Sequence, residues 1–267
     1  MESEPVDHGL PGHNWTLKKL RRWLKQVMDC DLARSSLHRI LCAARLGWKR
    51  CQKLPKKADP HKRAAFMQRF HQLYEGVWRL QTRLIYIDEA HIHRDMDIGY
   101  TWALKGKPAW RLSDSAPLAH RINWYGAYDF AAGRCLIWNE GSCNKEHTIQ
   151  FLQRLAAWLG DETGEAVIIW DGASWHRAKC VQKAAVKLGF TLIALPPYSP
   201  DLNPIEGLWK WMREEVTRNY CHPSMRHLFD ACKAFVDRIN TDPTTLVYRL
   251  WPKFKLDPEY EKLLVSN

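Results

Sequence analysis

Two aspartates follow apolar runs that are typical of buried strands. Asp88 comes directly after "LIYI", and Asp171 comes directly after "VIIW". An ionised carboxylate in a dry strand is strongly disfavoured unless something pairs with it. Open sheets that contain parallel strands bind ligands at the carboxyl ends of those strands, so we expect the two aspartates to stand side by side there. Like charges at close range raise a pKa unless a cation lies between them, and the pair therefore predicts a cation site.

A proline-rich loop delivers a third carboxylate, Glu206. Four prolines fall within nine residues of "LPPYSPDLNPIE", and they lower the flexibility of the segment that precedes Glu206. Asn203 is a suitable helix N-cap, Pro204 suits the first helical position, and Glu206 then falls at the third. One interpretation is a capping box, in which Glu206 folds back onto the Asn203 amide. The other is a metal ligand, which the positive end of the helix dipole keeps ionised.

Asp88, Asp171 and Glu206 on rigid elements predict a site for Mg²⁺ or Mn²⁺, because both ions prefer oxygen ligands. Two ions about 3.5–4 Å apart stabilise the attacking and the leaving oxygen of a phosphodiester displacement. An oxygen-rich site does not need imidazole, so nearby histidines are expected in supporting or surface roles, or orienting a phosphate or water. The weaker candidates for supporting roles around the carboxylates are Glu89, His91, His176 and Asn203.

Positive charge is concentrated near the N-terminus. The chain has 267 residues and a formal net charge of +11. Residues 1–63 hold 15 Lys or Arg against 6 Asp or Glu, whereas the remainder holds 25 against 23. This distribution predicts a polyanionic partner whose main contact lies in the N-terminal region. The alternative is a solvated basic face that maintains solubility.

The same region has the pattern of a helix-turn-helix. Apolar residues in 14–26 recur at helical spacing, with Asn14 as a candidate cap, and a second helical pattern follows the turn "MDCD". In such a motif the start of the second helix meets DNA, and basic residues beyond it contact phosphates. An ordinary helical hairpin remains the alternative. The candidate DNA-binding residues are Arg34, Ser35, Ser36, Arg39, Lys49, Arg50 and Lys53.

We predict three parts: a helix-turn-helix domain over 1–58, a linking helix over 59–82 capped by Asp59, and an α/β domain over 83–267. Strands come first in the last part, including one at 100–110, and strand–helix alternation follows, which predicts a mixed sheet flanked by helices. Asp129 has the character of a turn residue. Trp209 and Trp211 lie two apart on a helix, so we expect only one of them to face the core.

The blocks "YIDEAHI", "IIWDGASWH" and "LPPYSPDLNPIEGLWKWMRE" resemble the three catalytic blocks of DDE transposases, most closely the bacterial insertion-sequence branch of the Tc/mariner superfamily. The 34 residues between Asp171 and Glu206 match the spacing of that superfamily. The resemblance implies an RNase H-like catalytic fold, metal-dependent cleavage of DNA at inverted-repeat ends, and attack of the freed 3′-OH on target DNA. It also implies a dimer or larger assembly on paired ends.

One departure from that family concerns the DNA-binding region. Family members usually carry two helix-turn-helix units, and this chain has room for one before the linking helix, so the region looks truncated. Two other functions remain open: a DNA-binding protein that descends from such an enzyme without catalysing, and an endonuclease of the same fold that cuts without joining.

Several classes of protein are disfavoured by composition. No apolar run approaches the length of a membrane span, and the acidic, polar N-terminus does not resemble a signal peptide. The eight cysteines form no C-x-x-C pair, which argues against a zinc ribbon. We therefore expect a cytoplasmic bacterial protein with reduced thiols, bound to DNA of the nucleoid and not to a membrane.

Overall fold

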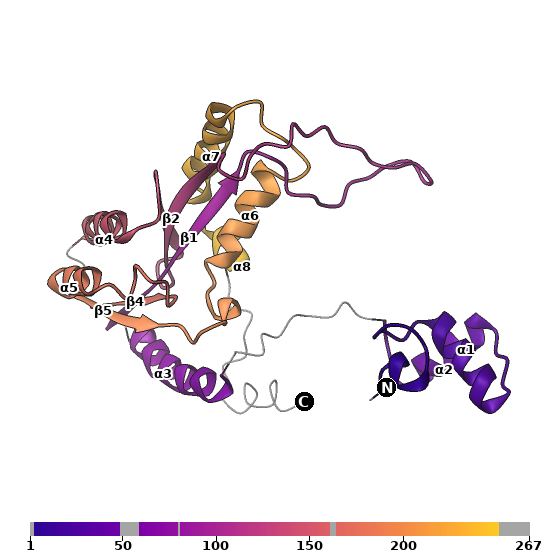
Figure 1. The fold of residues 1–267 in the computed structure, drawn as a ribbon. Helices are drawn as coiled ribbons and strands as arrows, with labels where there is room; N and C mark the ends of the chain where they lie inside the picture. The colour runs from indigo at the N-terminus through magenta and orange to yellow at the C-terminus, as the bar shows by residue number, and fades with distance from the viewer. Residues whose placement is uncertain (1–2, 49–58, 80, 161–163, 251–267) are drawn as a thin grey trace. The chain divides into compact units, whose positions relative to one another are not determined.

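The computed structural model describes residues 3–48, 59–79, 81–160 and 164–250 (Figure 1). Contacts divide the chain into two compact units, Met1–Leu54 and Pro55–Asn267. The predicted domain boundary near residue 58 lies outside the described residues, as do the basic candidates Lys49, Arg50 and Lys53. Each unit is described by itself below.

The first unit contains a short 3-10 helix, η1 (Pro5–His8), followed by α1 (Leu17–Met28) and α2 (Arg34–Ala43). The Thr16 side chain accepts a hydrogen bond from the backbone N–H of Lys19, so Thr16 and not Asn14 caps α1. The predicted cap was wrong because Thr16 lies directly before the first helical residue, where its hydroxyl reaches the N-terminal amides.

A tight turn joins α1 to α2, as the helix-turn-helix pattern predicts. Asp29 ends α1 in the left-handed region with a φ of 47°. Asp31, two residues on, accepts two hydrogen bonds from the Arg21 guanidinium at 2.9 and 2.7 Å. The small core of this unit holds the buried residues Leu10 and Leu37. The turn thus fixes α2 against α1 with its first residues exposed.

The second unit is built on one mixed sheet of five strands. Their order across the sheet is β3-β2-β1-β4-β5. The pairs β1–β2 and β2–β3 are antiparallel, whereas β1–β4 and β4–β5 are parallel. The strands are β1 (Thr82–His93), β2 (Arg121–Asp129), β3 (Arg134–Glu140), β4 (Glu165–Trp170) and β5 (Phe190–Ala194).

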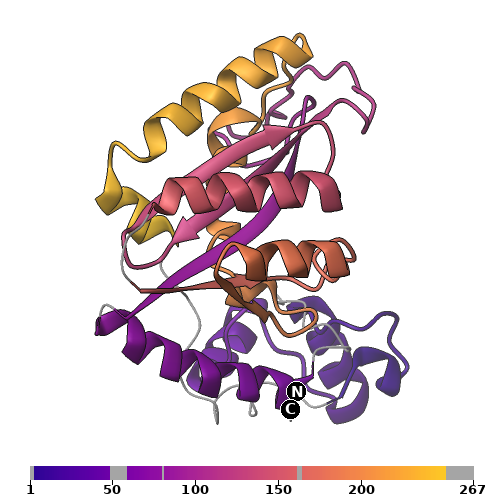
Figure 2. The same ribbon diagram turned by 90° about the vertical axis from the view of Figure 1, so that its left-hand side faces the viewer.

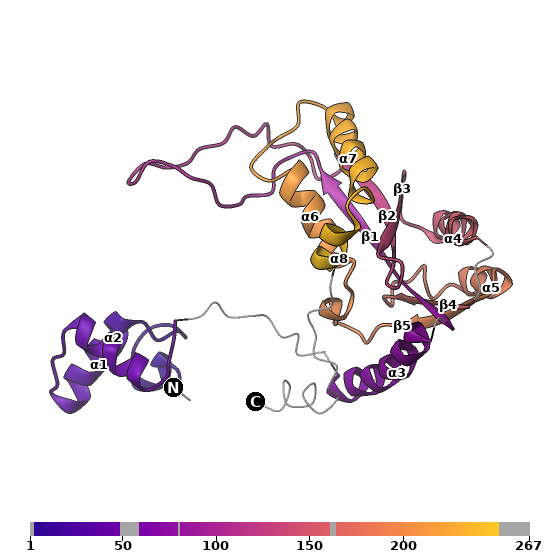
Figure 3. The same cartoon turned by 180° about the vertical axis from the view of Figure 1, so that it is seen from behind.

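Helices cover both faces of this sheet. Figure 2 is seen from the side of α4 and α5, and Figure 3 shows α6, α7 and α8 on the opposite side. The predicted mixed sheet flanked by helices is confirmed. The helices are α3 (Pro60–Trp78), α4 (Lys145–Leu159), α5 (Lys179–Lys187), α6 (Glu206–Val216), α7 (Met225–Ile239) and α8 (Pro243–Leu250), with a 3-10 turn, η2 (Pro200–Leu202), before α6.

Alternation along β1 produces two separate cores. Leu84 and Tyr86 belong to the core that the sheet shares with α3, α6, α7 and α8. Ile85 and Ile87 belong to the core shared with α4 and α5. Because both faces are buried, the strand is a continuous apolar run and shows no alternation of apolar and polar residues. The Asp88 carboxylate therefore lies on a strand that helices cover on both faces.

Two features of the second unit differ from the sequence expectation. Residues 100–110 form no strand. Among residues 94–120, the only β-type backbone pairing is one isolated β-bridge between Asp97 and Arg218. Gly106 and Pro108 interrupt this segment, and Figure 1 shows it projecting from the sheet without a neighbouring strand to pair with. In addition, α3 is part of the sheet unit, because Met67 and Phe70 are buried in its main core.

A buried ion pair ties the start of β1 to the end of β2. The side chain of Asp129 is 0% exposed, and its Oδ2 accepts a hydrogen bond from Arg83 Nη2 at 2.6 Å. Its Oδ1 accepts from the backbone N–H groups of Ala131 and Ala132, which is the turn role predicted for it. The burial and the pairing with Arg83 were not anticipated, since they arise from strand pairing across the sheet.

We expect Asp129→Ala to lower the free energy of unfolding of the second unit by about 3–5 kcal/mol, because it removes a fully buried carboxylate that pairs with the Arg83 guanidinium. Urea unfolding followed by circular dichroism measures the loss. Asp237→Ala, which removes an exposed partner of Lys233, is the control and should cost less than about 1 kcal/mol. Equal losses for the two variants would contradict the role given to the buried pair.

Candidate functional site

The parallel pairing of β1 and β4 brings Asp88 and Asp171 to neighbouring positions. The last paired residues are Tyr86 and Ile169, and each aspartate lies two residues beyond its strand's member of that pair. Asp171 directly follows the end of β4, as predicted. Asp88 does not end its strand, because β1 continues to His93 in partnership with β2. The two carboxylates therefore meet where the parallel pairing stops.

Helix α6 brings the third carboxylate to the same place. It begins at Glu206, two residues later than the proline pattern predicts, and Asn203 does not cap it. The Asn203 amide N–H donates to Pro200 O at 2.9 Å, so Glu206 does not close a capping box with it. Asn203 instead ends η2, and its buried side chain donates to Ile87 O at 3.4 Å, next to Asp88.

Trp209 links α6 directly to Asp88. The Trp209 Nε1 donates to Asp88 Oδ2 at 3.0 Å. The indole lies over Gly126, the residue of β2 that pairs with Asp88; a Cβ built on Gly126 would meet two carbons of the indole at 2.6 and 2.7 Å. Trp211 is also buried, at 4% exposure, against Phe235 of α7. Our expectation that only one of the two tryptophans faces the core was wrong, because α6 is packed between the sheet and α7.

His176 bridges Asp171 and Glu89 from the other side. Its Nδ1 lies 2.8 Å from Asp171 Oδ1, and its Nε2 lies 2.9 Å from Glu89 Oε1. The imidazole is buried and stacks on Trp170 with ring centroids 4.4 Å apart. Burial alone lowers the pKa of His176, but the hydrogen bonds to Asp171 and Glu89 outweigh it and raise the pKa to about 10. The ring is thus a buried cation between two carboxylates.

The three carboxylates interact electrostatically. Burial raises the pKa of Asp88 well above its usual range, and the charges of Glu206 and Asp171 add to the shift. Burial also raises the pKa of Glu206; Arg213 opposes the shift and Asp171 adds to it. That the positive end of the helix dipole keeps Glu206 ionised stays a prediction. The pKa of Asp171 is lowered by the hydrogen bond from His176.

By type, the oxygen donors are those that a divalent cation such as Mg²⁺ prefers, although the described side chains are not spaced as a formed metal site. All three ligand candidates are carboxylates, and a bound cation would offset the charges of Glu206 and Asp171, which add to burial in raising the pKa of Asp88. The buried Asn203 Oδ1 accepts no hydrogen bond from the described residues. Within that part of the chain, no group of three or more His, Cys, Asp or Glu side chains is spaced to hold a metal ion.

Not every predicted supporting residue reaches this cluster. The structure brings His176 to Asp171, Glu89 to the other ring nitrogen of His176, and Asn203 to the backbone beside Asp88. His91 is turned elsewhere, because its Nδ1 lies 2.6 Å from Asn123 Oδ1. Sequence reasoning missed Trp209 and Gly126. The one available signal was that Trp209 lies three residues after Glu206, which puts both on one helix face.

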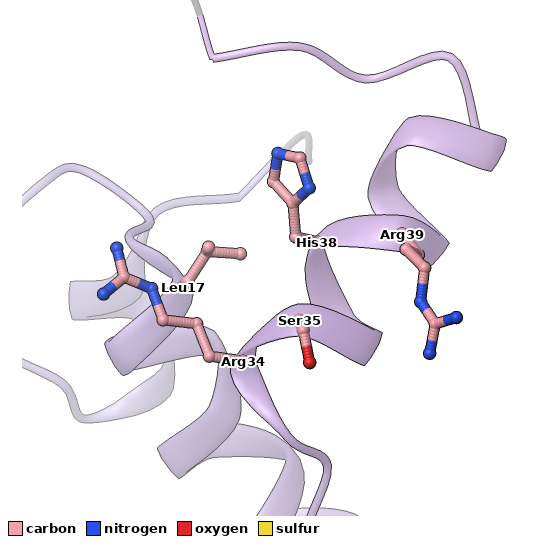
Figure 4. A pocket seen from close by; sticks show the side chains of 5 residues that line it. All are labelled: Leu17, Arg34, Ser35, His38 and Arg39. Carbon is pink, nitrogen blue, oxygen red and sulfur yellow. The ribbon is translucent and has the colours of Figure 1, made fainter.

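The candidate DNA-binding residues of the first unit lie at the start of α2. Arg34, Ser35 and Arg39 are exposed and Ser36 is partly buried. With His38 and Leu17 of α1, the three exposed residues line a cavity of about 660 Å³ (Figure 4). Figure 4 shows the Arg34 guanidinium beside Leu17 and the Arg39 guanidinium on the other side of the helix. Their contact with DNA stays a prediction.

The sequence matches the family described as DDE superfamily endonuclease over residues 83–228, which is more than half of the chain. Residues 11–70 match the family described as winged helix-turn helix, which extends into α3. The chain therefore belongs to the DDE superfamily endonuclease family. The family resemblance predicted from the three sequence blocks is confirmed.

Relatives include the insertion element IS630 uncharacterized 39 kDa protein of Shigella sonnei, 24% identical over 91% of this chain and 70% of that protein. An uncharacterized protein, y4pE/y4sA, of Sinorhizobium fredii is 34% identical over 31% of this chain and 59% of its own length.

Among solved structures, the Mos1 mariner paired end complex with Mn is 16% identical, with a TM-score of 0.63, over 97% of this chain and 80% of that one. The catalytic domain of the Mos1 mariner transposase is also 16% identical, with a TM-score of 0.52, over 82% of this chain and 97% of that one. These likenesses confirm the predicted RNase H-like fold.

Two further expectations concern the rest of the chain. Of the eight cysteines, the seven that the structure describes are free thiols. None of the helices in the described ranges combines the length and the apolar character required to span a bilayer.

We expect Gly126→Ala to lower the free energy of unfolding by about 1–3 kcal/mol, because the added methyl group displaces the Trp209 indole. Trp209→Phe removes the indole carbons that it would meet, so the loss should be smaller in that background. A double-mutant cycle in urea measures the coupling, expected at about 0.5–3 kcal/mol. Gly141→Ala, which meets nothing within 4 Å, is the control. Additive losses for Gly126→Ala and Trp209→Phe would contradict the contact.

Proposed function

We propose that this protein is the transposase of a bacterial insertion sequence, which cuts DNA at the ends of its element and joins the freed 3′-OH to target DNA. The single observation that carries the proposal is the juxtaposition of three carboxylates from three separate sequence blocks. Asp171 lies beside Asp88 in the register of the sheet, and its charge acts on both Asp88 and Glu206. Membership of the DDE superfamily endonuclease family supports the same activity.

Asp88, Asp171 and Glu206 are proposed as catalytic residues that hold Mg²⁺ or Mn²⁺, with two ions in the site. The bound ions supply Lewis-acid stabilisation of the charge that develops on the phosphate during displacement. One protein of similar fold, Mos1, was solved as a paired end complex with Mn and with Mg, which supports this choice of ion.

Among the protein's own groups, the three carboxylates would orient the scissile phosphate and the attacking oxygen relative to each other. In the first step water attacks the phosphorus and the 3′ oxygen leaves as a hydroxyl; in the second, that hydroxyl attacks a phosphodiester of the target and displaces another 3′ oxygen. Both steps are the same displacement, so one set of residues serves both. His176 contacts Asp171, Glu89 contacts the other ring nitrogen of His176, and Asn203 contacts the backbone beside Asp88; these contacts favour supporting roles for the three residues.

DNA is the proposed partner of both units. The excess of basic residues before residue 64 and the match to a winged helix-turn helix support end recognition by the first unit. We assign residues 1–58 to that role, 83–267 to catalysis, and 59–82 to a connecting segment whose helix α3 also packs in the core of the second unit. Relatives of similar fold include a Mos1 transposase paired-end complex, which supports action as an oligomer on two inverted-repeat ends. The chain would act on nucleoid DNA in the bacterial cytoplasm.

Cleavage and joining on a labelled duplex that carries the inverted repeats flanking the gene test this proposal. With Mg²⁺ or Mn²⁺ the wild type should give nicked and joined products, and Asp171→Ala should lower the rate by at least about 10³-fold, since a ligand of the catalytic ions contributes several kcal/mol. Asp237→Ala, an exposed change on α7, should keep the wild-type rate. Cutting without joining would identify an endonuclease. DNA binding without cutting, by the wild type and both variants, would identify a non-catalytic derivative.

We expect Arg34→Ala and Arg39→Ala to weaken DNA binding by the whole protein at every sequence. Each change should reduce the slope of log Kobs against log salt by about 1 if the residue contacts one phosphate. Arg21→Ala is the matched control, because that guanidinium is already paired with Asp31 within the first unit. An unchanged slope in both α2 variants would place the phosphate contacts elsewhere.

A further inference from the structure

Each of the two aspartates is hydrogen-bonded to a ring N–H on a different face of the sheet. Trp209 belongs to the core that contains α6, and its Nε1 donates to Asp88 Oδ2 at 3.0 Å. His176 stacks on Trp170, which belongs to the core that contains α4 and α5, and its Nδ1 lies 2.8 Å from Asp171 Oδ1. The pair of carboxylates is thus held between two rings that approach from opposite faces.

Both rings are themselves fixed. Trp209 is 1% exposed and fits over Gly126, where even one added carbon would collide with it. His176 is 2% exposed, and its second nitrogen is anchored by Glu89 Oε1, whose side chain is 7% exposed. A donor that cannot move holds the carboxylate that accepts from it in one orientation.

Such fixation matters because the two carboxylates repel each other. Asp88 and Asp171 occupy neighbouring positions at the end of the parallel pairing, so free rotation would turn their oxygens apart. Asp171 Oδ1 accepts both from His176 and from the Ala173 N–H at 2.9 Å, which leaves Oδ2 as the oxygen that the described residues do not engage. The donors therefore select which oxygens face the site.

We propose that Trp209 and His176 are positioning residues, which hold Asp88 and Asp171 in the orientation that binds the divalent ions. Glu89 and Gly126 act through them, Glu89 by anchoring the imidazole and Gly126 by leaving room for the indole. This inference rests on the proposed function, because it assumes that the aspartates are metal ligands. It adds to that function the claim that losing one ring N–H, while the packing is retained, weakens metal binding.

The test is the binding of Mn²⁺ to the full-length protein, measured as free Mn²⁺ by electron paramagnetic resonance, with no requirement for activity. Trp209→Phe keeps an aromatic side chain at this position of α6 and removes the donor to Asp88. Trp211→Phe makes the same change on the same helix, at a residue that donates to Glu215 and packs on Phe235. It is therefore the matched control for lost packing and stability.

We expect Trp209→Phe and His176→Phe to bind Mn²⁺ about 10–100-fold more weakly than the wild type, the usual effect of removing a group that orients a ligand. His176→Asn should recover part of the affinity, because its amide can still donate to Asp171, whereas a purely packing role would favour the phenyl ring stacked on Trp170. Trp211→Phe should bind as the wild type does.

Asp171→Asn distinguishes failure of the proposed metal site from failure of the positioning roles given to Trp209 and His176. If the wild type binds Mn²⁺ no better than Asp171→Asn, the proposed carboxylate site fails and the inference fails with it. If Asp171→Asn loses binding while Trp209→Phe and His176→Phe match Trp211→Phe, the inference alone is overturned. Weak binding by the two ring variants, with stability equal to that of Trp211→Phe in urea, supports it.

Discussion

The parallel pairing of β1 and β4 sets Asp88 and Asp171 next to each other, and the organisation of the second unit follows from the cost of that placement. Asp88 lies within an apolar strand that is buried on both faces, where water cannot fully solvate it, whereas the Asp171 side chain, just past the end of β4, is 54% exposed. Burial and the neighbouring charges raise the pKa of Asp88, whereas the hydrogen bond from His176 lowers that of Asp171. Two equivalent positions thus give two different electrostatic environments.

The helices and turns on the two faces of the sheet supply the third carboxylate and the hydrogen-bond donors that the strands do not provide. On one face, α6 carries Glu206 and Trp209 three residues apart, so a single helix delivers both a third carboxylate and a donor to Asp88. On the other face, the turn before α5 carries His176, which compensates the charges of Asp171 and Glu89. The absence of a side chain at Gly126 lets the α6 layer approach closely enough for the indole to reach β1.

Local patterns were enough to predict the five strands of the sheet and to single out the three acidic positions, because continuous apolar runs and the proline-rich block involve adjacent residues; the same patterns wrongly predicted a strand at 100–110. The contacts of those positions were not predictable in the same way. Trp209 meets Asp88 only because Gly126 lies opposite it on another strand, and Trp211 is buried only because α7 covers it. The cap predicted at Asn203 failed for a related reason: its side chain reaches Ile87 across the core and does not serve its own helix.

A site that gathers three carboxylates repels the phosphate backbone on which it is proposed to act. Cations in the site offset this repulsion locally, and Arg213, which lowers the pKa of Glu206, contributes in the same sense. The larger source of attraction lies elsewhere, since residues 1–63 hold 15 basic against 6 acidic residues and the remaining chain is nearly balanced. Affinity for a polyanion and the chemistry of its cleavage place opposite demands on charge. Along this chain the excess of positive charge lies before residue 64, away in sequence from the three carboxylates.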